Sequence, residues 1–434
     1  MSGLAEGSIG FVALLFMLGI GVPVAYAMGL VAAVGIYLSV GDRFLLTTFK
    51  SMPYALTSDY NFVVIPMFVL MGAIAGRAGI IRDLYTAAQY LMSRLRGSLL
   101  MATIFAQAGF AAASGSTVVA SSVFTRMALP EMLRFGYNGG VAGGCIAAAG
   151  TLAGLIPPSI AMVLFAMLTS EPVGQLLVAG IVPGALTAFS YAIGIRLFLI
   201  VRPEWAPNAD QNVTWAMRGR ALSKVWSVLL LMLLVMGGIY LGFYPPSAAG
   251  AVGAAGALVI ALSMRRVNGK DIWDSLLEAV RMSAIIFAIV IGGLLFSRFL
   301  LISGFIPELR GVIVATEIGP FGFIAITIAI FMLLGMFVDS VSLLVIAVPF
   351  LYPISQSLGI DAIWFAVLVV KLIEIAAITP PVGLNLYAVL AAADGKLRAG
   401  ALFKGVLPFI AIELVILALI ITFPEIVLYL PRQM

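Results

Sequence analysis

The sequence predicts an all-α integral membrane protein made of two inverted-topology repeats, with about ten spanning helices plus two re-entrant hairpins. Hydrophobic residues make up 63% of the 434 positions, only 10% are charged, and the mean hydropathy is +1.17, so lipid is the predicted solvent. The apolar runs have the length of helices, which satisfy their own backbone hydrogen bonds in hydrocarbon. A pattern of glycines and prolines also returns at near-constant spacing, which indicates a duplication.

The duplication is clearest at two Pro-Pro pairs. Pro157-Pro158 returns as Pro380-Pro381, an offset of 223 residues (380 − 157). One such match arises easily by chance, whereas a shared register along most of both halves does not. The sequence therefore predicts a first copy at 1–201, a cytoplasmic connector at 202–224 and a second copy at 225–434. The same offset relates four more landmarks, which are Gly19 with Gly242, Pro23 with Pro246, Pro130 with Pro353, and Gly136 with Gly359.

Each copy is predicted to cross the bilayer five times, at about 20 apolar residues per crossing. An odd number of crossings turns the second copy upside down relative to the first. Two apolar segments, 98–132 and 319–357, are too long for one span and carry small or polar residues at their middles, which predicts re-entrant hairpins. Amphipathic stretches near 80–96 and 305–317 are predicted to lie along the interface as arms. The predicted spans are 8–21, 24–40, 61–76, 139–168 and 174–201, then 225–243, 247–263, 283–302, 362–392 and 404–422.

The distribution of basic residues supports this layout, because Lys and Arg collect in cytoplasmic loops. Asp and Glu divide evenly between the two sides, and both termini are predicted to face outward. A single tilted span over 8–40 would place the N-terminus inside, but the pairing of Pro23 with Pro246 favours two spans. The segments assigned to the outside hold few basic residues, namely Arg43, Lys50, Arg310 and Arg432.

Composition also excludes several classes of function. The chain has one cysteine, Cys145, and no histidine, which excludes an internal disulfide and disfavours zinc sites and histidine acid-base chemistry. Lys and Arg are scattered between apolar spans rather than gathered into a patch, so no nucleic acid partner is expected.

The Pro-Pro pairs predict where the chemistry lies. Proline lacks an amide donor and clashes with the preceding turn, so each pair is expected to break its helix in mid-span. Free carbonyls and half-helix ends at that depth suit a small cation and an anion respectively. A simple kink is the alternative, which the polar neighbours disfavour. These neighbours are Gly150, Thr151, Ser159, Thr379, Gly383 and Asn385.

The hairpin tips are predicted to supply the other half of the site. Ser114-Gly115-Ser116-Thr117 aligns with Asp339-Ser340-Val341-Ser342. Their hydroxyl, carbonyl and carboxylate oxygens are ligands that replace the hydration shell of sodium. The alternative is that these side chains cap hairpin helices or bond between helices.

Ionisable residues inside spans are functional by default. Asp339 is the best candidate, as a sodium ligand or a proton-coupled carboxylate. Lys371 and Glu374 stand three residues apart on one helical face and are predicted to neutralise each other. Arg298 is expected either to meet a substrate carboxylate or to extend to the interface. No role is assigned to the two others, Arg196 and Glu413.

These motifs resemble, over nearly the full length, the large membrane subunit of TRAP (tripartite ATP-independent periplasmic) transporters, within the wider ion transporter superfamily. The resemblance implies sodium-coupled uptake by an elevator motion, in which a transport region of hairpins and broken helices slides against a scaffold region in a bacterial inner membrane. It also implies two protein partners, a small four-helix membrane subunit and a periplasmic binding protein that delivers a small organic anion such as a dicarboxylate or sugar acid. The motifs that carry the resemblance are Gly136-Tyr137, Ala149-Gly150-Thr151-Leu152, Ile156-Pro157-Pro158-Ser159, Gly335-Met336-Phe337-Val338-Asp339-Ser340 and Thr379-Pro380-Pro381-Val382-Gly383-Leu384-Asn385.

The resemblance also implies two sets of sodium ligands, and the remaining polar positions are predicted to contact substrate. The first sodium site would use Ser114, Gly115, Ser116, Thr117, Gly150, Thr151 and Pro157, and the second Gly335, Asp339, Thr379 and Val382. The substrate positions are Ser159, Arg298, Ser340, Ser342 and Asn385.

Two other functions are weighed against this one. A stand-alone sodium- or proton-coupled anion carrier of the same superfamily would need no binding protein. An intramembrane enzyme or a purely structural subunit is disfavoured, because the chain has no histidine and no convincing pair of nucleophile and base.

Overall fold

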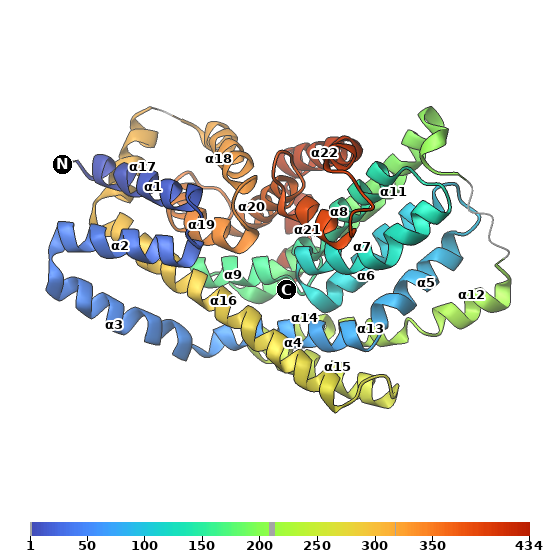
Figure 1. Ribbon diagram of the computed structural model, residues 1–434. Coiled ribbons are helices and arrows are strands. Elements are labelled where there is room, and N and C mark those ends of the chain that lie inside the picture. The colour runs from blue at the N-terminus through green and yellow to red at the C-terminus, as the bar shows by residue number, and fades with distance from the viewer. Residues whose placement is uncertain (1, 208–212, 317) are drawn as a thin grey trace.

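The computed structural model describes residues 2–207, 213–316 and 318–434, and these residues form helices and no strands (Figure 1). The predicted connector 202–224 contains residues 208–212 and the predicted arm 305–317 ends at 317, and these positions lie outside the described residues. The described part of the connector forms a 3-10 turn, η2 (Pro203–Trp205), and α12 (Trp215–Leu222).

The two predicted copies contain similar but not identical series of elements. The first half contains α1 (Gly3–Gly19), α2 (Val24–Val40), α3 (Asp42–Ser58), η1 (Tyr60–Val63), α4 (Val64–Arg77), α5 (Ile80–Met92), α6 (Ser98–Ser114), α7 (Thr117–Arg134), α8 (Gly139–Leu155), α9 (Ile160–Thr169), α10 (Val173–Ala179) and α11 (Ile181–Val201). The second half contains α13 (Trp226–Met232), the π-helical turn η3 (Leu233–Gly237), α14 (Gly238–Tyr240), α15 (Pro246–Ser263), α16 (Gly269–Ile302), α17 (Phe305–Ala315), α18 (Pro320–Gly335), α19 (Ser340–Ser357), α20 (Ala362–Ala377), α21 (Leu384–Ala392), α22 (Ala399–Thr422), α23 (Glu425–Leu428) and η4 (Pro431–Gln433).

Two helical segments differ from the sequence prediction. No helix was predicted between residues 40 and 61, where α3 lies, and α16 begins at Gly269 instead of residue 283. Both segments carry charged residues, so a search for apolar runs misses them. A capping box between Asn268 and Asp271 opens α16, which continues unbroken for 34 residues, whereas its first-half counterpart is divided into α3, η1 and α4.

The predicted number of about ten spans is not confirmed. By length and apolar composition, seven helical stretches among the described residues are suited to crossing a membrane, or eight if the bent pair α8–α9 counts as one span. Helices α1 and α2 have 17 residues each and belong to a class of shorter apolar helices.

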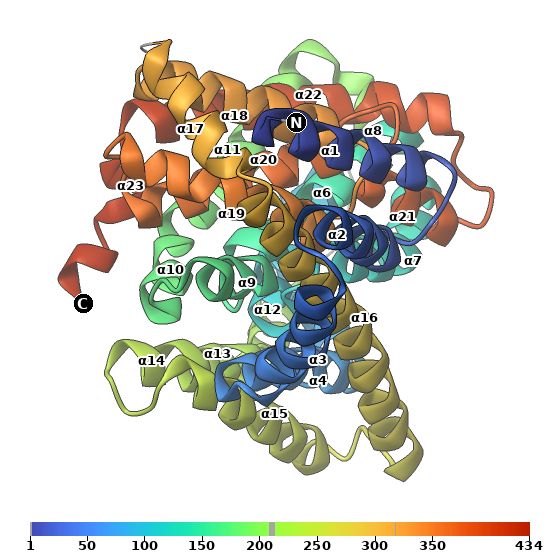
Figure 2. The ribbon, with the colours of Figure 1, turned by 90° about the vertical axis from the view of Figure 1, so that its left-hand side faces the viewer.

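The helices form two parts, which contact each other where α16 packs on α19 and where α4 packs on α6. The framework part comprises α2, α3, α4, α15 and α16, in which α16 packs on α2 and α4, and α15 packs on α4. The core part comprises the hairpins α6–α7 and α18–α19, the broken helices α8–α9 and α20–α21, and α22. In Figure 1 α16 runs diagonally across the molecule, with α4 and α15 at its lower edge, and Figure 2 shows the core part above them.

The predicted arms correspond to α5 and α17. At α17, the carboxylate of Glu308 accepts hydrogen bonds from the backbone amides of Gly3 (2.8 Å) and Leu4 (2.9 Å). These amides lower the pKa of the Glu308 carboxyl. The bonds tie the start of α1 to the second arm.

Glycines allow α8 and α22 to approach closely within the core part. A Cβ atom on Gly144 would lie 2.5 Å from the carbonyl oxygen of Gly405, and one on Gly405 would lie 2.1 Å from the backbone of Gly140. Small residues at such crossings let helix backbones come together in membranes, where packing rather than hydrophobic exclusion drives association. The backbone contact therefore depends on Gly405 remaining a glycine.

We expect Gly405→Val to lower stability by about 1–3 kcal/mol or more, because the added side chain would push α22 away from α8. Gly400→Val is the matched control, since Gly400 lies in the same helix and a Cβ there would meet no atom within 4 Å. Thermal unfolding of the purified protein in detergent measures the difference. Equal melting temperatures for the two variants would contradict the close-packing interpretation.

Candidate functional site

Both predicted helix breaks are present. Helix α8 ends at Leu155 and α9 begins at Ile160, with a bend of 41° between them. Helix α20 ends at Ala377 and α21 begins at Leu384. The Pro157-Pro158 and Pro380-Pro381 bonds, both cis, lie inside these breaks, as does Val382.

Each hairpin tip contacts the break of its own copy. In the first copy, Gly115 has φ of 61°, and a Cβ there would lie 2.7 Å from the carbonyl oxygen of Pro158. In the second copy, the amide of Gly383 donates to the carbonyl oxygen of Met336 at 3.3 Å. Interrupted backbone in the core part is thus covered by protein, as a membrane interior requires.

The two tips and the helix ends beside the two breaks line one cavity of about 240 Å³, which we call the central cavity. Both tips contribute to its lining, and so do both broken helices. The framework contributes only apolar side chains, all from α16. The lining residues are Gly115, Ser116, Thr117, Val118, Gly154, Ile160, Ala161, Met282, Ile285, Ile286, Ile289, Asp339, Ser340, Val341, Val370, Ile373, Glu374, Ala377 and Leu384.

Four helices begin at the central cavity. The first residues of α7 (Thr117), α9 (Ile160), α19 (Ser340) and α21 (Leu384) all line it. A helix N-terminus carries partial positive charge and unpaired amides, so the four together favour an anion. None of the described residues that line this cavity is Lys or Arg. Its attraction for an anion would therefore come from the backbone.

Several predicted site residues act as helix caps, as the alternative interpretation proposed. Asp339 caps α19, with Oδ1 accepting from the amides of Val341 and Ser342 at 3.1 Å each, while the Ser342 hydroxyl donates to Oδ2. Ser116 caps α7 through the amide of Val119 at 3.5 Å. Asp339 and Ser116 also line the central cavity, so capping holds their oxygens at its wall.

Unpaired oxygens gather behind the first tip, around Gly150. A Cβ on Gly150 would lie 2.1 Å from Ser121 Oγ, 3.2 Å from the Thr117 carbonyl oxygen and 3.3 Å from Gln107 Oε1. Ser121 Oγ and Gln107 Oε1 are buried and have no hydrogen-bond partner among the described residues. The same holds for Ser114 Oγ, which lies at the end of α6 on the wall of another cavity. Buried oxygens without donors are the ligand set that a sodium ion uses, so these residues fit the ion. Ser121 and Gln107 were not predicted as sodium ligands from the sequence, because they lie outside the tip motif.

Three more predicted positions lie close to the breaks and bond locally, of which Ser159 and Thr151 are buried and Thr379 is half-buried. The Ser159 hydroxyl caps α9 and donates to the Gly154 carbonyl. The Thr151 hydroxyl donates to the Ala148 carbonyl of the same helix at 2.7 Å, and the Thr379 hydroxyl donates to the Ile375 carbonyl of α20 at 2.6 Å.

Two further predicted positions, Gly335 and Asn385, pack between elements of the core part. A Cβ on Gly335, at the end of α18, would lie 2.5 Å from the Cβ of Ala376. Asn385 Nδ2 donates to the Ala147 carbonyl at 3.5 Å, which links α21 to α8 of the other copy, and its Oδ1 has no partner among the described residues.

Arg298 is not brought to the central cavity. It lies on an exposed face of α16, with its guanidinium 5.7 Å from the centre of the Phe44 ring. Its position therefore gives no support to a role in substrate binding. The sequence alone did not show which face of this long helix is turned toward the cavity.

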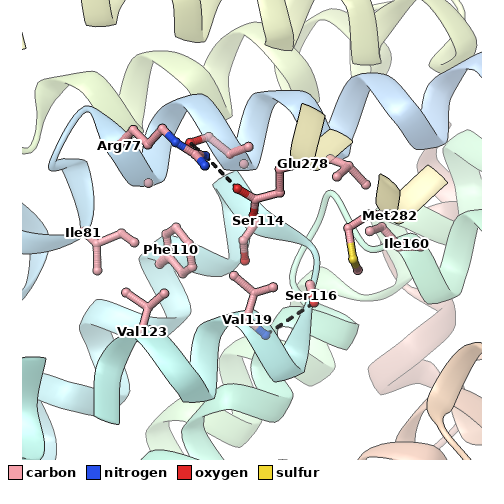
Figure 3. Close-up of a pocket in the computed structure, with 14 residues that line it drawn as sticks. Arg77, Ile81, Phe110, Ser114, Ser116, Val119, Val123, Ile160, Glu278 and Met282 are labelled. Atoms are coloured by element: carbon pink, nitrogen blue, oxygen red, sulfur yellow. Dashed lines mark hydrogen bonds and ion pairs between the residues drawn. The ribbon is translucent and has the colours of Figure 1, made fainter. Parts of the chain in front are cut away.

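A second cavity of about 210 Å³, which we call the side cavity, lies on the other side of the first tip (Figure 3). It shares Ser116, Ile160 and Met282 with the central cavity. On its far wall Arg77 Nη1 of α4 pairs with Glu278 Oε2 of α16 at 2.7 Å. The first tip therefore stands between two cavities.

A buried charged cluster lies inside the core part. The predicted pairing of Lys371 with Glu374 is confirmed at 3.4 Å, but the shorter contact of Lys371 Nζ, 2.5 Å, is with Glu413 Oε2. Lys371 Nζ also donates to Thr187 Oγ1 at 3.0 Å, and the Tyr191 hydroxyl donates to Glu413 Oε1. No role was predicted for Glu413 from the sequence. The only feature of the sequence that indicated one was its position as an ionisable residue within a predicted span.

Comparison with protein families identifies one match. A family model described as tripartite ATP-independent periplasmic transporter, DctM component, matches residues 11–426.

Three relatives match over most of their length. A C4-dicarboxylate TRAP transporter large permease protein DctM of Pseudomonas aeruginosa is 32% identical, covering 87% of each chain. An ectoine/5-hydroxyectoine TRAP transporter large permease protein, UehC, of Ruegeria pomeroyi is 27% identical, covering 97% of each. A sialic acid TRAP transporter large permease protein, SiaM, of Vibrio cholerae is 27% identical, covering 98% of each.

A solved structure shares the fold. The YdaH transporter of Alcanivorax borkumensis, described as having an unusual topology, superposes with a TM-score of 0.65 at 14% identity. The match covers 95% of this chain and 98% of that one.

We expect Lys371→Met to lower stability by about 3–5 kcal/mol, because it leaves two buried carboxyl groups without the ammonium that contacts both of them. Lys396→Met is the control, since Lys396 is exposed and belongs to no ion pair among the described residues. Thermal unfolding in detergent compares the two variants. A Lys371→Met protein as stable as the control would show that the cluster does not need its ammonium.

Proposed function

The chain belongs to the DctM-component family of tripartite ATP-independent periplasmic transporters, and on this premise we propose that it carries a small organic anion inward by sodium-coupled secondary transport. It is a multi-pass membrane protein, and its proposed place is the bacterial inner membrane. A periplasmic binding protein delivers the anion, and a small four-helix membrane subunit completes the transporter.

The observation that carries the proposal is the meeting of four helix N-termini at the central cavity. Their combined partial charge favours an anion at a place where no basic side chain of the described residues is present. A volume of about 240 Å³ suits a small carboxylate better than a drug-sized ligand, for which pockets begin at about 300 Å³. Dicarboxylates and sugar acids are therefore the proposed substrate class.

Sodium is proposed to bind at both tips as a co-substrate. At the first tip, the candidates are the unpaired oxygens of Gln107, Ser114 and Ser121, together with the Thr117 carbonyl beside Gly150. At the second tip, the candidate is the Asp339 carboxylate. Both sets are oxygens only, which suits an alkali cation.

An elevator motion is supported by the unequal walls of the central cavity. Every polar lining side chain among the described residues belongs to the core part, while α16 presents Met282, Ile285, Ile286 and Ile289. An apolar wall makes no directional bonds, so it lets the core part slide with its substrate and ions. The side cavity, which reaches the predicted cytoplasmic Arg77, is the proposed exit route.

Uptake in proteoliposomes tests the proposal, with a labelled C4-dicarboxylate and labelled sialic acid as probes and with the binding protein and small subunit encoded by neighbouring genes. We expect uptake to need an inward sodium gradient and the binding protein. Uptake that persists when potassium replaces sodium would reject sodium coupling. Uptake without the binding protein would instead identify a self-sufficient carrier.

The charge of Asp339 can be separated from its capping role, because asparagine also caps helices. We expect the unchanged protein to melt at a higher temperature in sodium than in potassium at equal ionic strength. Asp339→Asn should remain folded but lose most of this difference in melting temperature. For an ion at 100 times its dissociation constant that difference corresponds to about 2.7 kcal/mol. Asp339→Ala, which removes cap and charge, should in addition be less stable in potassium.

Sodium stabilisation of Asp339→Asn equal to that of the unchanged protein would remove Asp339 from the ligands and leave it as a cap. Ser357→Ala serves as a control, because its hydroxyl lies at the far end of the same helix and bonds to the Ile354 carbonyl.

A further inference from the structure

The charged cluster of the core part contains more acid than base. Lys371 and Glu374 come from α20, and Glu413 comes from α22. Their side chains have exposed fractions of 0%, 2% and 0%. With both carboxylates ionised the cluster would hold a net negative charge in the membrane interior, where an uncompensated charge is costly.

The hydrogen bonds show which carboxylate lacks a partner. The ammonium of Lys371 donates to Thr187 Oγ1 at 3.0 Å and to Glu374 Oε2 at 3.4 Å, and it forms a closer ion pair with Glu413 Oε2 at 2.5 Å. Glu413 contacts Lys371 with one oxygen and accepts from Tyr191 with the other. Two carboxylate oxygens of the cluster, Glu374 Oε1 and Glu413 Oε2, are buried without a hydrogen bond among the described residues. Glu413 Oε2 has the ion pair with Lys371, whereas Glu374 Oε1 has no ion pair either.

The helices around Glu374 provide no second cation. Across the central cavity it faces Asp339, which is acidic, and α9, α10 and α18 contain no titratable side chain. Three other titratable side chains on the surrounding helices have partners elsewhere, namely Cys145 with Leu100, Tyr352 with Glu171, and Glu278 with Arg77. Arg196, Arg281, Arg298, Tyr387 and Lys404 are exposed. Lys270, Asp271 and Asp274 lie in the first turns of α16, before the first residue of that helix to line the central cavity, Met282.

Glu374 is also the one member of the cluster that lines the central cavity. We propose that Glu374 is a proton-binding site, at which a proton from cavity water adds to the Glu374 carboxylate and leaves by the same route. Binding of the proton converts the Glu374 carboxylate to a neutral carboxylic acid. The charged groups that remain in the cluster are then the Lys371 ammonium and the Glu413 carboxylate. This inference goes beyond sodium coupling and does not rest on it.

Infrared spectroscopy of the purified protein in lipid nanodiscs tests the proposal without substrate or sodium. A protonated carboxylic acid has a C=O stretch above the carboxylate and amide bands. We expect such a band at neutral pH, with a shift on transfer to D2O because the cavity admits water. It should be lost in Glu374→Gln and kept in Glu204→Gln, which alters an exposed glutamate.

Two further variants keep the test decisive if Glu374→Gln fails to fold. Glu413→Gln retains Glu374 but removes the excess negative charge, so the band should disappear. Gly154→Ala should shift the band, because its Cβ would lie 2.7 Å from Glu374 Oε1. Absence of the band from the unchanged protein, or its persistence in Glu374→Gln or Glu413→Gln, would overturn the proposal. If the band does not move in Gly154→Ala, the proton resides on another group. If the band does not shift in D2O, the proposal that the proton reaches Glu374 through the cavity is wrong.

Discussion

The structure depends on one constraint, which is that interrupted backbone inside a membrane must find its partners in protein. Two helices are interrupted at Pro157-Pro158 and Pro380-Pro381, and a hairpin tip contacts each break. Because a tip is the end of one helix and the start of another, bringing two tips to two breaks assembles four helix starts in one place. The anion-favouring field of the central cavity is thus a consequence of how the breaks are covered.

Local chemistry explains what could be predicted from sequence and what could not. Each Pro-Pro pair removes two successive backbone donors and breaks its helix, whereas single prolines such as Pro130 and Pro353 lie inside helices. Gly115 marks a turn with positive φ. The breaks and the tips were therefore predicted correctly. The roles of Gln107, Ser121 and Glu413 depend on which helix packs beside them, and Glu413 lies 42 residues from Lys371 (413 − 371). Helical periodicity did not reveal that Arg298 faces away from the cavity or that α16 extends back to Gly269.

The acidic groups of the central cavity would provide a physical basis for the proposed coupling of anion and cation transport. Asp339 and Glu374 line the same space that four N-termini make favourable for an anion. An anion beside two ionised carboxylates would be repelled, since like charges at short range cost energy in a low dielectric. Cations at the tips and a proton on Glu374 would each remove part of that repulsion. Binding of the anion and binding of the cations would then strengthen each other reciprocally.

Helix α16 is long enough to border both cavities. At 1.5 Å per residue, its 34 residues span about 51 Å, well beyond the roughly 30 Å of a hydrocarbon core. One continuous helix therefore offers a wall along the full depth of the membrane, and its side chains at both cavities include the shared Met282. In the proposed elevator motion, a core part that holds the anion and its cations would move against this wall without breaking a polar bond to it, because the α16 side chains that line the central cavity are apolar.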